Sequence, residues 1–409
     1  FGAEYREEEF DLFAGDAASY ALGPLASQGF SSSSNGFGGF PADTSASQDS
    51  TAFYIDLEAD ITDAITMQAA VRNEDFSTFG DTTNYKLAGI VRLTEKLRLR
   101  GALSTGFHAP TAGQASITNV TTQIVNGALT DQGTLPLFSA PGQLAADFIE
   151  SQGSGRPTLG PEEADNYSIG VAIDLENSSW TIDYYNIEVT DRVALGANIN
   201  FLDALNFAGG SSFGSVSDAL TGLSDAGAIN RQDFVGLEDL KQFRFFTNSF
   251  DTETKGIDIV GSTDFAFADG ESKITVAFNY NKTTVTDRGE INPISDSRVE
   301  ALQDLLPNWK GNVAWSHMQG NFRTLIRANY YGSWRSTGNG YNLGSTTLVD
   351  AQVAYDYSES LQLVLGVENL FDKYPAENPG AGGVGQLYPE DSPFGFNGGS
   401  WYVQARYTF

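Results

Sequence analysis

The side chains that carry most enzymatic and metal chemistry are scarce in this chain. Its 409 residues include no cysteine and two histidines. The lack of cysteine excludes disulfide scaffolds, zinc–thiolate sites and cysteine nucleophiles. Two histidines disfavour a histidine-dependent catalytic triad, and carboxylate pairs such as Glu162–Glu163 and Glu390–Asp391 lie in segments with loop composition. We therefore predict that the chain is not an enzyme, and we predict no catalytic residue, cofactor or metal site.

A few polar side chains suit ligand binding instead. Arg327, Tyr331 and Arg335 lie near the end of a predicted strand, 321–333, and fit an anionic or hydroxyl-rich ligand. His108, at the end of another predicted strand, is a further candidate contact. The alternatives are that the inward arginines pair with carboxylates of the same wall, and that His108 is a solvated strand-end residue.

The overall charge excludes one class of partner. The chain has 23 Lys+Arg and 52 Asp+Glu, a formal net charge of −29, and it contains no run of basic residues. Binding of nucleic acid needs a basic face to neutralise phosphates, so we predict no nucleic-acid partner. The 41% apolar content and 12% aromatic content are too high for a disordered chain.

The elements that must position these side chains follow a period of two residues. Leu361, Leu363 and Leu365 alternate with Gln362 and Gly366, for example, as in a β-strand with one apolar face. The apolar positions of the clearest strands carry no charged residue, which is typical of a strand that faces lipid. Fourteen strands are predicted: 1–11, 50–59, 64–74, 82–93, 97–107, 164–175, 178–189, 254–267, 271–283, 308–318, 321–333, 344–357, 360–371 and 399–409.

The connections between these strands alternate between short and long. Short polar turns such as Glu176–Asn177 separate long segments, an asymmetry typical of transmembrane barrels. Short helices are expected near 201–207 and 215–223 within one long connection. The predicted fold is an all-β, transmembrane, antiparallel up-and-down barrel. The long connections are 12–49, 75–81, 108–163, 190–253, 284–307, 334–343 and 372–398.

The last predicted strand has the features of an assembly signal. Trp401, Val403, Tyr407 and the terminal Phe409 share one face of 399–409. Bacterial outer-membrane barrels resemble this pattern, which their assembly machinery reads. We therefore expect the barrel assembly machinery and outer-membrane lipid to be partners.

Ordered motifs resemble the barrel of TonB-dependent outer-membrane receptors. The segment 103–111, LSTGFHAPT, is similar to that family's STGFRAPT motif, with His108 in place of arginine. The segment 367–373, VENLFDK, matches its GxxNLFDK motif. Further weak matches occur at 70–80, 159–170 and 254–258. The residues that carry the two main motifs are Gly106, Phe107, Pro110, Asn369, Leu370, Phe371 and Asp372.

The resemblance implies a function and a larger protein. Receptors of this family have a barrel of about 22 strands around a plug, so residues 1–409 would form the C-terminal part of the barrel, without the plug and the first strands. It implies a Gram-negative outer-membrane receptor that imports a ferric siderophore, a cobalamin-like compound or an oligosaccharide with energy from the TonB–ExbB–ExbD complex. A passive 14-stranded porin and a soluble carbohydrate-binding β-domain are the alternatives.

Overall fold

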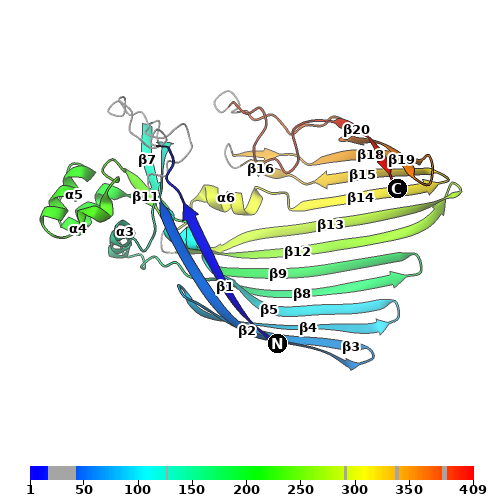
Figure 1. Ribbon diagram of the computed structural model, residues 1–409, viewed down its shortest axis with the longest axis horizontal. Helices are drawn as coiled ribbons and strands as arrows, with labels where there is room; N and C mark the ends of the chain where they lie inside the picture. Colours follow the sequence, from blue (N-terminus) through cyan, green and yellow to red (C-terminus); the bar gives the residue numbers. More distant parts are fainter. Residues whose placement is uncertain (17–42, 126–127, 290–292, 337–339, 380–384) are drawn as a thin grey trace.

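The main feature of the computed structural model is one antiparallel sheet of fourteen strands (Figure 1). The structure describes residues 1–16, 43–125, 128–289, 293–336, 340–379 and 385–409. All fourteen predicted strands are confirmed, in the predicted order. Across the sheet they are β1 (Gly2–Leu12), β2 (Thr44–Thr62), β3 (Ile65–Phe76), β4 (Gly80–Thr94), β5 (Leu97–His108), β8 (Glu162–Leu175), β9 (Ser178–Leu195), β12 (Phe246–Phe267), β13 (Gly270–Asp287), β14 (Trp309–Gln319), β15 (Phe322–Tyr331), β18 (Thr346–Asp356), β19 (Leu361–Glu368) and β20 (Ser400–Tyr407).

The register places apolar side chains from all these strands on one face. Ile257 of β12 lies opposite Tyr184 of β9 and Tyr280 of β13, and Tyr280 lies opposite Trp309 of β14. Because directly opposite residues share a face, the alternation in each strand adds up to a continuous apolar surface. Large apolar side chains on this surface are exposed; Ile169, for example, is 62% exposed. A water-soluble sheet would bury such a surface, whereas a membrane-spanning barrel turns it toward lipid.

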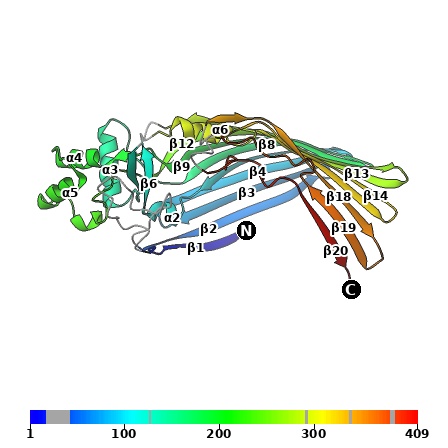
Figure 2. The ribbon, with the colours of Figure 1, turned by 90° about the horizontal axis from the view of Figure 1, so that it is seen from above.

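The sheet is curved and open at both edges (Figure 2). In the described part of the chain, β1 pairs with β2 and β20 pairs with β19, and no pairing joins β1 to β20. A closed 14-stranded porin would need that pairing. The fold is therefore a curved section of a barrel wall.

The ends of the sheet differ as the alternating connections predict. Turns such as Glu176–Asn177 and Ala268–Asp269 close one end, and the longer connections extend from the other. One predicted long connection, 75–81, is wrong. Both flanking strands continue into it, leaving a three-residue turn, Ser77–Phe79, that is followed by Gly80 with φ +82°. Most of the predicted connection 12–49 lies outside the described residues, and its last part belongs to β2.

Two long connections fold together into a unit with its own core, the external unit. It contains a small sheet, in the order β10 (Ile199–Asn200), β11 (Gln242–Arg244), β7 (Ala128–Thr134) and β6 (Asn119–Val125). Its helical segments are α2 (Ala112–Ser116), α3 (Ala140–Ser151), α4 (Phe201–Gly209), α5 (Val216–Asp225) and η2 (Arg231–Phe234). Phe201, Phe234, Phe243, Phe245 and Leu205 are almost fully buried within it. The two predicted helices are thus confirmed as α4 and α5, which begin after the N-caps Asn200 and Ser215.

Smaller elements complete the long-connection end. Helix α6 (Asp296–Asp304) packs against β13 and β16. A short hairpin consists of β16 (Trp334–Ser336) and β17 (Tyr341–Leu343). Among the helices of the described ranges, none has both the length and the apolar character needed to cross a bilayer.

Candidate functional site: the polar wall and the external loops

The face opposite the apolar surface forms a polar wall in which side chains bridge across an intervening strand. Arg100 of β5 forms a two-pronged ion pair with Asp183 of β9, with its Nε 2.7 Å from the Asp183 Oδ1. The strand between them, β8, carries Gly170, and a Cβ there would overlap the Asp183 carboxylate. Glycine at this position therefore lets a carboxylate reach a guanidinium two strands away.

The same arrangement recurs elsewhere on the wall. Tyr402 of β20 lies over Gly366 of β19 and donates its hydroxyl proton to Gln352 of β18 at 2.9 Å. Tyr185 of β9 lies over Gly256 and accepts from the Asn279 amide at 3.3 Å. These bridges satisfy polar groups within the wall and tie three strands together at each point.

A hollow of about 300 Å³ lies on this wall, lined in part by one of the predicted contacts, Tyr331. It is lined by Asp258, Asn279, Lys310 and Tyr331 among others. Asn279 donates to Asp258 at 2.6 Å, and Tyr331 lies opposite Lys310 in the register. The wall therefore offers amide, hydroxyl, ammonium and carboxylate groups in one place, a set suited to hydrogen-bonding a polar solute.

The four predicted ligand contacts are not brought together. Arg327 and Tyr331 lie on β15, and Arg327 is opposite Asp350 of β18. Arg335 lies in β16, where its Nη2 is 3.0 Å from the Glu300 carboxylate of α6. Arg335 therefore has a carboxylate partner, but one that belongs to α6 and not to the wall of the predicted alternative. His108 is exposed at the end of β5, opposite Glu162, and five strands separate β5 from β15.

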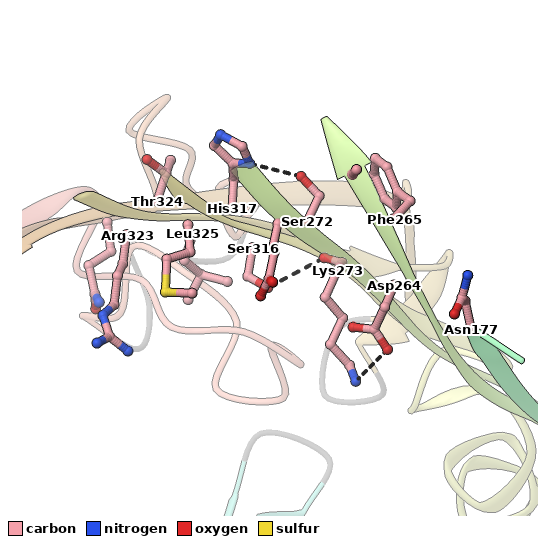
Figure 3. Close-up of a pocket in the computed structure, with 14 residues that line it drawn as sticks. Asn177, Asp264, Phe265, Ser272, Lys273, Ser316, His317, Arg323, Thr324 and Leu325 are labelled. Atoms are coloured by element: carbon pink, nitrogen blue, oxygen red, sulfur yellow. Dashed lines mark hydrogen bonds and ion pairs between the residues drawn. The ribbon is translucent and has the colours of Figure 1, made fainter. Parts of the chain in front are cut away.

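A second hollow, of about 730 Å³, lies at the short-turn end (Figure 3). On the polar face Lys273 reaches Asp264 at 3.4 Å, whereas His317 shares a 2.9 Å hydrogen bond with the buried Ser272 on the apolar face. Arg323 also lines it and pairs with Asp356 at 3.0 Å. No motif in the sequence points to these residues, because they come from several separate strands.

The first family motif holds the external end of β5 in place. Phe107 meets Phe76 of β3 edge to face, with the ring centres 5.6 Å apart. Pro110 is almost fully buried, and its carbonyl accepts a hydrogen bond from the Gln48 amide of β2 at 3.2 Å. Gly106 lies opposite Ala164 of β8. These contacts give the motif a structural role at the junction of the wall and the external unit.

The second motif forms a clamp over the last three strands. Asn369 adopts φ +48° and binds the Lys373 backbone twice, accepting from its N–H at 3.0 Å and donating to its carbonyl at 2.7 Å. The Asn369 N–H donates to the Asp350 carboxylate of β18 at 3.0 Å. Asp372 accepts from the N–H of Gly399, just before β20, at 2.8 Å. Leu370 and Phe371 are exposed.

The predicted assembly signal lies on an open edge. Trp401 and Val403 of β20 are 74% and 68% exposed, opposite Val367 and Leu365 of β19. Tyr407 and Phe409 meet edge to face with ring centres 5.1 Å apart. Their apolar side chains continue the lipid-facing surface, as expected for the predicted signal. Its recognition by the assembly machinery stays a prediction.

The large antiparallel sheet has one apolar face, one polar face and folded loops at one end. These features are those of the outer-membrane β-barrel class of proteins. Within the described residues, no three His, Asp or Glu side chains converge closely enough to hold a metal ion. A family model described as TonB dependent receptor-like, beta-barrel matches residues 2–370. The chain belongs to this family, whose members are receptors and transporters of the Gram-negative outer membrane that bind ligands and interact with TonB.

Individual relatives are distant in sequence. The vitamin B12 transporter BtuB of Photobacterium profundum is 22% identical over 330 residues, which is 80% of this chain and 40% of the transporter. The siderophore receptor PirA of Acinetobacter baumannii has a TM-score of 0.59 at 15% identity, over 100% of this chain and 51% of PirA. A mutant of the ferric enterobactin receptor PfeA of Pseudomonas aeruginosa has a TM-score of 0.64 at 15% identity, over 100% of this chain and 50% of PfeA. The chain thus spans about half the length of the solved receptors.

Proposed function

We propose that this chain is the C-terminal barrel part of an outer-membrane receptor that imports a scarce, large solute. The solute classes are a ferric siderophore, a cobalamin-like compound or an oligosaccharide, and the energy comes from the TonB–ExbB–ExbD complex. The observation that carries the proposal is the family match over residues 2–370. BtuB is a vitamin B12 transporter, PirA is a siderophore receptor and PfeA is a ferric enterobactin receptor, which supports the first two solute classes.

The open sheet supports a partial barrel. Strands β1 and β20 present unpaired edges among the described residues, and such edges are costly in a membrane because their backbone groups lack partners. Further strands of the whole receptor would cover them, and a plug would occupy the space in front of the polar wall. TonB would act through that plug, so this chain supplies the wall and the external loops.

In this proposal, different regions of the chain have different tasks. The external unit and the wall hollow beside Tyr331 offer polar groups to a solute that arrives from outside. Arg327, Tyr331, Arg335 and His108 stay predicted contacts. The apolar surface would contact outer-membrane lipid, and the barrel assembly machinery would read the last strand.

Uptake measurements in cells test the proposal. The full-length receptor would be expressed in Gram-negative cells that lack their own outer-membrane receptors, with TonB present or deleted. Radiolabelled cyanocobalamin, ferric enterobactin and a maltooligosaccharide would be supplied in turn. We expect accumulation of one of these solutes only when TonB is present. Equal uptake without TonB would establish a passive channel, and uptake of none of them would reject all three solute classes.

A further inference from the structure

A separate cavity of about 790 Å³ lies where several external connections meet. It is bounded by α2, by the end of β9 and the turn that follows it, by β11 and the start of β12, and by α6. Its volume falls in the usual range for small-molecule sites. The polar side chains that line it are Gln114, Asn198, Arg244, Ser295, Ser297 and Arg298.

The charge of this cavity is opposite to that of the chain. Two guanidiniums, those of Arg244 and Arg298, line it, and no carboxylate of the residues that the structure describes does, in a chain whose net charge is −29. The nearby carboxylates of α6 are engaged elsewhere, since Asp296 pairs with Arg288 at 2.6 Å and Glu300 pairs with Arg335 at 3.0 Å. The cavity is thus a positive site inside an acidic surface.

Arg244 differs from the other arginines of the external unit. Arg156 and Arg231 both form ion pairs with carboxylates, whereas the Arg244 guanidinium has no hydrogen bond or ion pair to any residue that the structure describes. The side chain is half-buried, and this burial lowers the pKa of the guanidinium. Desolvating a guanidinium without a partner is unfavourable. A bound anion would supply the charged partner and so offset that cost.

The backbone around Arg244 is fixed before any ligand arrives. Arg244 lies between Phe243 and Phe245, both fully buried, and its carbonyl accepts from the Leu135 N–H at 3.0 Å. On the opposite side, α6 is held by Ile294 and Val299, which pack with Ala194 and Phe250. A preformed site of this kind loses little conformational freedom on binding.

We propose that this cavity binds an oxyanion group, a carboxylate or a phosphate, of the transported solute, with Arg244 as the buried anchor and Arg298 as the outer contact. The planar guanidinium matches either group through two parallel hydrogen bonds. The inference rests on the proposed import function and narrows its substrate class to solutes that carry such a group.

Binding to the purified full-length receptor in detergent tests this site without any energy source. Citrate and inorganic phosphate serve as oxyanion probes, and sucrose serves as the neutral probe. We expect saturable binding of at least one anion and none of sucrose. The Arg244→Gln and Arg298→Gln variants should each weaken it by about tenfold, with Arg244→Lys intermediate. The matched control is Arg231→Gln, because Arg231 belongs to the same external unit but pairs with Glu238 at 2.8 Å; it should bind as the parent does.

The possible results separate this site from the import function. Unchanged anion binding in the folded Arg298→Gln variant, which alters an exposed residue, would overturn the proposal even if Arg244→Gln failed to fold. Absence of binding by either anion would do the same, while TonB-dependent uptake in cells would still stand. Loss of citrate binding when lipopolysaccharide is added would show that a lipid phosphate is the occupant and would overturn the assignment to the solute.

Discussion

Replacement of Asn369 by alanine should open the clamp that joins β18, β19 and β20. The change removes both side-chain hydrogen bonds to Lys373, each worth about 0.5–1.5 kcal/mol. It also places alanine at φ +48°, a left-handed conformation that costs roughly 1 kcal/mol. The sum is about 2–4 kcal/mol in the local opening free energy. By contrast, Asn369→Gly loses the same bonds without the conformational cost and should lose about 1 kcal/mol less.

Hydrogen–deuterium exchange of the full-length receptor in detergent measures this opening directly. The loss corresponds to exchange that is about 30- to 900-fold faster at the Gly399 amide and at the first amides of β20. Amides of β8 and β9, far across the sheet, are the internal reference. Exchange of the Gly399 amide at the parental rate in both variants would refute the clamp. Equal rates in the two variants would refute the argument from φ.

Three further changes test other parts of the structure. Gly170→Ala should lower the free energy of unfolding by about 1–3 kcal/mol, because the added methyl group overlaps with Asp183. Adding Asp183→Ala should restore most of that loss, as measured by urea unfolding. No rescue by the second change would contradict the bridging geometry. Val313→Arg, on the apolar face, should lower the free energy of unfolding by about 2–4 kcal/mol. Asn312→Arg, on the polar face next to it, should lower it by less than about 1 kcal/mol. Similar losses in the two variants would argue against a lipid-facing surface. Phe243→Ala should cost the external unit about 3–5 kcal/mol and make it sensitive to limited proteolysis while the large sheet stays protected; a parental cleavage pattern would contradict an independent core.

The strands could be predicted because their signal is local. Each strand alternates apolar and polar residues within about ten positions, and lipid on one side keeps that alternation nearly free of charge. Even β1, with its run of Glu7, Glu8 and Glu9, forms because it pairs with β2 over its whole length. The predicted long connection 75–81 is wrong because polar residues there, such as Asp75 and Asp81, still pair across the hairpin.

The binding groups could not be predicted in the same way, because contacts distant in sequence create them. The external sheet depends on a parallel pairing of β7 with β11, in which Thr134 lies opposite Arg244. No local sequence pattern predicts which distant strand β7 will pair with. Likewise, the sequence alone does not distinguish Gly170 from other strand glycines. Its role becomes clear only from the register, which places Asp183 above it. The pairing of Arg335 with Glu300 of α6 shows why an arginine near the end of a predicted strand is by itself weak evidence for a ligand contact.

Cysteine scanning tests most directly whether this sheet is a membrane wall with a wet inner face. The chain has no cysteine, so each introduced thiol is unique within it. Single cysteines would replace Val313, Ile326 and Ala328 on the apolar face, and Asn312, Leu325 and Asn329 on the polar face, in the membrane-embedded full-length receptor. We predict that a membrane-impermeant maleimide labels the second set and spares the first. Equal labelling of both sets, or the reverse pattern, would contradict the membrane-wall structure on which the import function depends.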